Sequence, residues 1–164
     1  MGARATPSLP LPPLATQWAE DLRALAWLHA GERDRATLVR ARREGFPQDL
    51  ALGPLPSATL SAMGEALDAL AHDTAGDLEL AADYAGIYLT HACRAAPFES
   101  VWRDEDGLVL QQPTFDVRAF FRRHGVAAAD WRVMADDHLA LELEFVALLL
   151  ERGDGADALH FLDE

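Results

Sequence analysis

Apolar residues recur along this chain mainly at spacings of three and four, which is the period of an amphipathic helix. The stripe is clear in residues 14–30, where four leucines and Trp18 share one face. The same period predicts helices over residues 34–44, 114–124 and 135–151, with further helices beginning at Ser57, after Gly76 and near Asp154.

The segment 135–151 carries apolar side chains on more than one face and ends in an apolar run from Phe145 to Leu150. A helix that is apolar on several sides is buried on several sides, so we expect this helix at the centre of the domain. The run is the longest apolar stretch of the chain. A membrane-spanning helix needs about 20 such residues, and we therefore expect no direct membrane insertion.

Two segments lack the helical period. Residues 1–13 contain four of the nine prolines and are expected to form a tail outside a helical domain that spans residues 14–164. Residues 93–113 form a long connection with Pro97, three acidic residues at 104–106 and Gly107. A loop of this length inside a compact helical domain commonly has a function.

The composition favours helices throughout. The chain has 31 Ala and 26 Leu against seven Val and one Ile, so helix formers abound and β-branched residues are scarce. We predict an all-α, single-domain bundle of six to seven helices. The single cysteine, Cys93, excludes an internal disulfide and any site built from several cysteines.

The charge is unevenly distributed. Residues 50–164 hold seven Arg and 21 acidic residues, a net charge of −14, and the chain has no Lys. Such a surface repels polyanions, so we expect no nucleic-acid partner, whereas a basic partner would be attracted. The alternative is that the acidic residues serve only to keep the protein in solution. No apolar segment follows Arg4, so we expect no signal peptide and a cytoplasmic location.

The helix at 135–151 contains a candidate for metal or proton chemistry. His138 and Glu142 are four residues apart, which places them on one helix face. The simpler interpretation is that Asp137 caps the helix and the other two side chains brace its first turn. Di-metal bundles need Glu-x-x-His on two helices, a motif that this chain lacks, so we expect no metal or other cofactor.

The connection at 93–113 contains a second candidate, in which aromatic residues flank one acid. Phe98, Glu99, Ser100 and Trp102 lie within five residues. Either the aromatics pin the loop to the core, or they form a binding lip whose acid meets a cation. Ser100 has no nucleophile-elbow context, and the chain has neither a P-loop nor a dinucleotide fingerprint. We therefore predict no catalytic residue.

Four motifs in order resemble the TorD/DmsD/NarJ family of redox-enzyme maturation chaperones. The most distinctive part of the resemblance lies between residues 83 and 145. The four motifs there are Asp83-Tyr84-x-x-Ile87-Tyr88, Pro97-Phe98-Glu99-Ser100-Val101-Trp102, Val117-x-x-Phe120-Phe121-x-x-x-Gly125 and Asp137-His138-Leu139-x-x-Glu142-Leu143-Glu144-Phe145.

The resemblance implies a helical chaperone that is not an enzyme. The family binds the catalytic subunit of a molybdenum oxidoreductase, often at its twin-arginine leader, until the cofactor has been inserted, and so prevents premature export. The expected partner is therefore such an apo subunit with its leader, and the chain would act as a monomer or a domain-swapped dimer. The client-binding residues that we predict from these motifs are Tyr84, Phe98, Glu99, Ser100, Trp102, Asp137, His138 and Glu142.

The chain departs from the family pattern mainly at its end. Family members typically continue past Phe161 with another helical segment, so we expect the last helix here to be shortened. Two other classes of function remain open at this point. One is a helical adaptor with a client that is not a redox enzyme, and the other is a small helical metal-dependent enzyme.

Overall fold

The computed structural model describes residues 13–51, 57–73, 76–90 and 95–163, and within these ranges it is helical with no strand. The prediction of an all-α fold is confirmed. Cys93 and the predicted tail before Pro13 lie outside the described residues. None of the helices in the described ranges is both long and apolar enough to cross a membrane.

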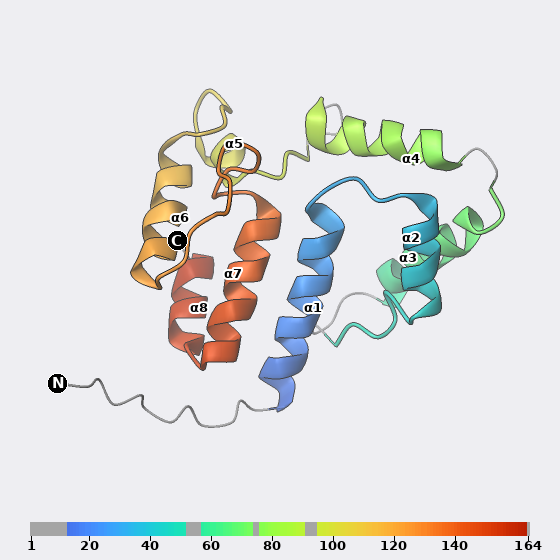
Figure 1. Ribbon diagram of the computed structural model, residues 1–164, viewed down its shortest axis with the longest axis horizontal. Helices are drawn as coiled ribbons and strands as arrows, with labels where there is room; N and C mark the ends of the chain where they lie inside the picture. The colour runs from blue at the N-terminus through green and yellow to red at the C-terminus, as the bar shows by residue number, and fades with distance from the viewer. Residues whose placement is uncertain (1–12, 52–56, 74–75, 91–94, 164) are drawn as a thin grey trace.

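Eight α-helices and one π-helical turn make up the described part of the chain (Figure 1). They are α1 (Pro13–His29), α2 (Arg35–Arg43), α3 (Ser57–Leu70), α4 (Gly76–Tyr84), the π-helical turn η1 (Ala85–Leu89), α5 (Glu99–Arg103), α6 (Gln112–Arg123), α7 (Leu139–Arg152) and α8 (Gly155–Asp163).

The main core forms where α7 packs against α1, α6 and α8. Phe145, Val146 and Leu149 of α7 are buried against Phe120 and Phe121 of α6. Aromatic rings meet edge to face across this contact, with the Phe120 and Phe145 centroids 5.8 Å apart. The helix with apolar residues on several faces is therefore the central one, as its pattern predicted.

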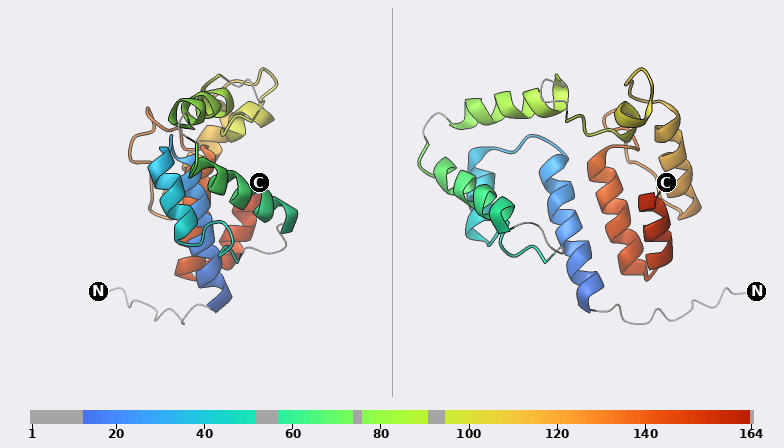
Figure 2. Two further views of the ribbon diagram at one scale, coloured as in Figure 1. Left: turned by 90° about the vertical axis from the view of Figure 1, so that its right-hand side faces the viewer. Right: turned by 180° about the vertical axis from the view of Figure 1, so that it is seen from behind.

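A smaller core joins α2, α3 and the second half of α1, around buried Leu38, Phe46 and Leu67. Figures 1 and 2 show α1 between this group and α7. Apolar side chains of α1 contribute to both cores, Leu22 to the larger one and Trp27 to the smaller one. The helix α1 thus ties the two halves together.

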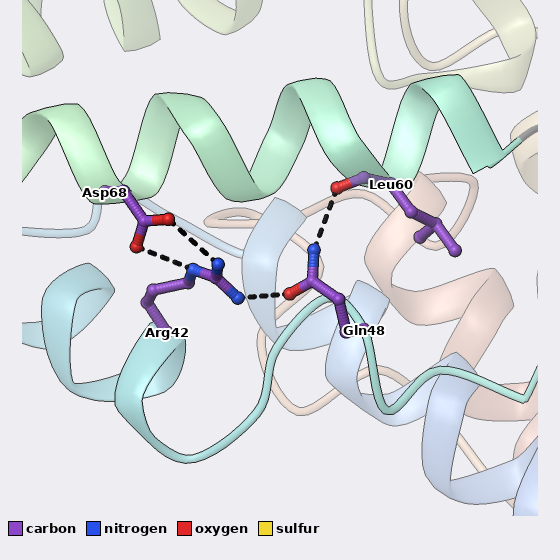
Figure 3. A network of polar contacts seen from close by, with 4 residues as sticks. All are labelled: Arg42, Gln48, Leu60 and Asp68. Carbon is purple, nitrogen blue, oxygen red and sulfur yellow. Dashed lines mark hydrogen bonds and ion pairs between the residues drawn. The ribbon is translucent and has the colours of Figure 1, made fainter.

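A polar network joins α2, the loop that follows it and α3 beside the smaller core (Figure 3). Arg42 of α2 donates two hydrogen bonds of 2.9 Å to the Asp68 carboxylate of α3 and a third to the side chain of Gln48. Gln48 in turn donates to the Leu60 carbonyl at 3.0 Å. A Cβ on Gly64 would lie 2.5 Å from the Gln48 amide nitrogen, so a larger residue there would displace the Gln48 side chain from this network.

The helix ends contain the residues that the sequence indicates. Asp34 caps α2 by accepting the Thr37 N–H at 2.7 Å. Gly153 ends α7 with φ of 80°, the left-handed conformation that glycine adopts without strain.

We expect Gly153→Ala to destabilise the fold by about 1 kcal/mol, because a Cβ strains the left-handed conformation. Nothing lies within 4 Å of the added Cβ, so strain is the whole effect. The matched control is Gly155→Ala, which also meets open space but lies in α8 without a positive φ. Chemical denaturation of both variants tests this; an equal loss of stability in both would contradict it.

Candidate functional site

The loop motif and the α7 motif meet in the structure. Phe98 and His138 lie opposite one another in an isolated antiparallel bridge. The Glu99 N–H donates to the Asp137 carbonyl at 3.0 Å, and the Leu139 N–H donates to the Pro97 carbonyl at 2.7 Å. These two bonds fix the start of α5 against the start of α7, so seven of the eight predicted residues come from two segments in direct contact.

The Asp137 carboxylate holds α5 in place. Its Oδ2 atom accepts the Ser100 N–H at 2.9 Å, and both residues are completely buried. A carboxylate in this position cannot reach a docked protein without a rearrangement of the fold. We therefore infer that Asp137 and Ser100 position the site rather than touch a ligand.

His138, and not Asp137, caps α7. Its Nδ1 atom accepts the Ala140 N–H at 3.1 Å, and the helix begins at Leu139 instead of residue 135. The suggestion that Asp137 caps the helix is therefore wrong. The reason is that the Asp137 side chain is already used by α5. The chain just before the helix is non-helical because the Asp137 carbonyl and the Leu139 N–H pair with the loop.

The His138 imidazole is neutral at physiological pH. Burial lowers its pKa, and the nearby His29 lowers it further, against an opposing effect from Asp137. The ring also packs edge to face on Phe98, with centroids 5.1 Å apart. A neutral ring with Nδ1 as acceptor serves the helix cap, and protonation of Nδ1 would break that bond.

Two carboxyl groups line a pocket of about 210 Å³ between α5, α7 and α8. Glu99 and Glu142 lie at this pocket, and its other walls are apolar: Leu139, Leu143, Val146, Phe161 and Leu162.

The Glu142 carboxyl resists ionisation. Burial raises its pKa to about 8, and the neighbouring Glu99 and Asp137 carboxylates add to the effect. A hydrogen bond between the Glu142 and Glu99 side chains also favours the protonated form. At pH 7 the Glu142 carboxyl is therefore mostly protonated.

Trp102 presents an exposed aromatic surface on α5. It is three residues from Glu99 on the one-turn helix α5, so both lie on one side of it. The indole N–H donates to the Ala96 carbonyl at 2.8 Å, which fixes the ring while 62% of the residue stays exposed. An anchored, exposed tryptophan is suited to contact apolar groups of a partner.

Tyr84 lies in a neighbouring aromatic cluster rather than at the pocket. Its ring stacks on Tyr88 of η1 with centroids 4.7 Å apart, and the Tyr88 hydroxyl hydrogen bonds to His29 Nδ1 at the end of α1. His29 connects this cluster electrostatically to His138. No local pattern in the sequence indicates a role for His29, because its pairing with η1 joins residues 59 positions apart.

The ion pair between Arg118 and Asp136 is a further feature that the sequence did not reveal. Arg118 Nε and Nη2 donate to one Asp136 oxygen at 2.9 and 2.7 Å, and Asp136 is 2% exposed. The guanidinium lies over the rings of Phe115 and Trp131. This pair anchors the segment before α7 to α6, directly beside Asp137.

The arrangement is suited to binding a partner. Across the described residues, no group of three or more histidine, cysteine, aspartate or glutamate side chains is placed to hold a metal ion. A larger pocket of about 420 Å³ between α1, α2 and the following loop shares no residue with the predicted site. The predicted residues instead combine acidic groups, apolar walls and one exposed indole.

Comparison with known proteins gives matches of one kind. Residues 54–164 match the family model described as nitrate reductase delta subunit. A protein named Chaperone protein TorD from Vibrio vulnificus is 30% identical over 127 residues, which are 77% of this chain and 57% of the relative. A protein of the same name from Vibrio cholerae serotype O1 is 32% identical over 129 residues, 78% of this chain and 58% of the relative.

The chain therefore spans rather more than half the length of these curated relatives. No solved structure matches it significantly.

Proposed function

From its place in the nitrate reductase delta subunit family, the TorD/NarJ chaperones, to which this chain belongs, we propose that it is a maturation chaperone for one redox enzyme. The resemblance predicted from the four sequence motifs is thereby confirmed. The proposed client is the apo catalytic subunit of a molybdenum-containing oxidoreductase. The chain would bind the twin-arginine leader or N-terminus of this client in the cytoplasm, assist cofactor insertion and delay export.

The observation that supports this proposal most is the contact between α5 and the start of α7. Glu99 and Glu142 line one pocket there, and Trp102 follows Glu99 by three residues on α5 with its indole exposed. A basic leader followed by an apolar stretch offers the complementary groups, cations for the carboxyls and aliphatic side chains for the indole. The mechanism is binding alone, in which no covalent bond of the client is made or broken.

The buried members of the predicted set support the exposed ones. Asp137 and Ser100 hold α5, and His138 caps α7, so the three maintain the geometry of the pocket and of Trp102. Tyr84 belongs to the adjacent cluster on η1 and would extend the surface toward α4.

Co-expression tests the proposal. A tagged chain produced with the catalytic subunit of a molybdoenzyme from the same genome should copurify with that subunit in its cofactor-free form. The molybdenum content of the enzyme should fall when the chain is absent. Recovery of only unrelated proteins, with normal molybdenum content in the absence of the chain, would favour the helical adaptor instead.

We expect binding of the leader to weaken several-fold when the salt concentration rises from about 50 mM to about 500 mM. The exposed acidic residues attract the leader over distances of about 8–10 Å, and salt screens that attraction. Titration calorimetry with a leader peptide measures the effect. Affinity that does not change with salt would mean that the acidic surface serves only to keep the protein in solution.

A further inference from the structure

The larger pocket, of about 420 Å³, has no role in the proposed function. It lies between α1, α2 and the loop that follows α2, which Figure 1 shows on the side of α1 that faces away from α7. Its volume is in the range of pockets that hold small organic ligands. It shares no side chain with the pocket of Glu99 and Glu142, so a ligand bound here would leave those carboxyl groups accessible.

The inner wall of this larger pocket is apolar and fixed by packing. It includes Trp27 of α1 and Phe46 and Leu50 of the loop, which belong to the smaller core or pack against it. The Arg33 guanidinium lies over the Trp27 ring, 4.8 Å from its centroid, and donates to the Trp27 carbonyl, which holds the indole in place. A wall of this kind can pack against the hydrocarbon part of a ligand.

The rim of the pocket is charged. It contains Glu20 of α1, Arg40 of α2, Glu44 at the C-terminal cap of α2 and Asp49 of the loop, all of them exposed. Within the residues that the structure describes, none of these four side chains forms an ion pair, although Arg40 and Glu44 are one helical turn apart. Their charges are therefore available to a ligand.

A fifth charged residue of the lining, Asp21 of α1, lies deeper. It is 7% exposed and accepts the Ala51 N–H through Oδ2 at 2.6 Å, so it anchors the loop. Four carboxylates and one guanidinium therefore give the lining a formal charge of −3. Such a lining attracts a cation with several charges and repels nucleotides and other polyanions.

We propose that this pocket binds a linear aliphatic polyamine. The methylene chain lies against Trp27 and Phe46, and the ammonium groups pair with the carboxylates of Glu20, Glu44 and Asp49. A polyamine combines several positive charges with hydrocarbon between them, which are the two features that the rim and the wall select. The interaction is binding alone, and no covalent bond changes.

Titration calorimetry of the full chain with spermidine, a linear triamine, tests the proposal. The salt concentration is kept at about 50 mM, so that screening does not hide the attraction. Two comparison ligands separate the contributions: Mg²⁺ carries two charges without hydrocarbon, and N-acetyl-lysine amide carries a hydrocarbon chain with one ammonium group. We expect spermidine to bind at one site, at least about tenfold more tightly than either of them.

Four variants with matched charges make the result specific. Glu44→Gln should weaken spermidine binding about fivefold, whereas Arg40→Gln should strengthen it by a similar factor, because these two rim charges act on a cation in opposite directions. Glu32→Gln and Arg43→Gln remove the same charges from exposed residues that do not line the pocket, and they should change binding by less than about twofold. All four side chains are exposed, so the melting temperatures should stay close to that of the wild type.

Binding of Mg²⁺ or of N-acetyl-lysine amide as tight as that of spermidine would overturn the proposal, because the apolar wall or the several charges would then contribute nothing. Equal effects of Glu44→Gln and Glu32→Gln, or the absence of saturable spermidine binding, would also overturn it, since the cation would then only neutralise the acidic surface. Copurification of the client subunit tests the proposed function separately, and its result does not depend on this pocket.

Discussion

Replacing Asp136 with alanine is expected to destabilise the protein by about 3 kcal/mol, because it leaves the Arg118 guanidinium largely buried without its carboxylate. For a chain of this size that loss lowers the melting temperature by roughly 6–12 °C. The segment 135–138 would also lose its anchor on α6, so leader binding should weaken in the same variant. Thermal melting followed by circular dichroism measures the first effect.

The control for this variant is a second arginine–aspartate pair, also joined by two hydrogen bonds, at the surface. Arg42 and Asp68 form two hydrogen bonds of 2.9 Å, yet 59% of the Asp68 side chain is exposed (Figure 3). Water replaces such a partner, so Asp68→Ala should leave the melting temperature nearly unchanged. Equal losses in the two variants would contradict the account, since burial would then not decide the outcome.

Replacing Trp102 with alanine is expected to weaken leader binding about 30-fold, or about 2 kcal/mol, the usual effect of removing a central aromatic from an interface. The indole is mostly exposed, so little core packing is lost and the fold should stay intact. Fluorescence anisotropy with a labelled leader peptide measures the affinity.

Two controls separate recognition from folding in this experiment. Trp102→Phe keeps an aromatic surface but loses the hydrogen bond to the Ala96 carbonyl, and it should recover most of the binding. Leu78→Ala removes an apolar side chain that is 80% exposed on α4, and it should leave binding unchanged. If all three variants weakened binding equally, Trp102 would have no special role.

The helices could be predicted from the sequence because their signals are local. Apolar spacing, Asp34 before α2 and Gly153 after α7 act within a few residues, and the predicted boundaries of most helices agree within two positions. The exceptions are the start of α7 and the one-turn helix α5, which lies in the segment 93–113 that was predicted as a loop. The predicted first turn of α7 is non-helical because the Asp137 carbonyl and the Leu139 N–H pair with Glu99 and Pro97, a contact that no local pattern contains.

The sequence indicated which residues belong to the candidate site, but not the structural role of each one. The motifs placed the Phe98 and His138 segments in one family pattern, and the structure brings them together. Periodicity alone could not indicate that Asp137 is buried under α5, that His138 is the cap or that Asp136 pairs with Arg118. Each of these contacts joins segments that are distant in the sequence, except the cap, which depends on where the helix begins. Their roles in client binding stay predictions.

Site-specific photo-crosslinking tests the central claim most directly. A photoreactive p-benzoylphenylalanine replaces Trp102 in one sample and Leu78 in a matched control, and each tagged chain is irradiated in cells that express the molybdoenzyme subunit. We predict an adduct from position 102 that mass spectrometry maps to the N-terminal leader of the catalytic subunit, and none from position 78. Adducts of equal yield from both positions, or an adduct from position 78 alone, would contradict the account.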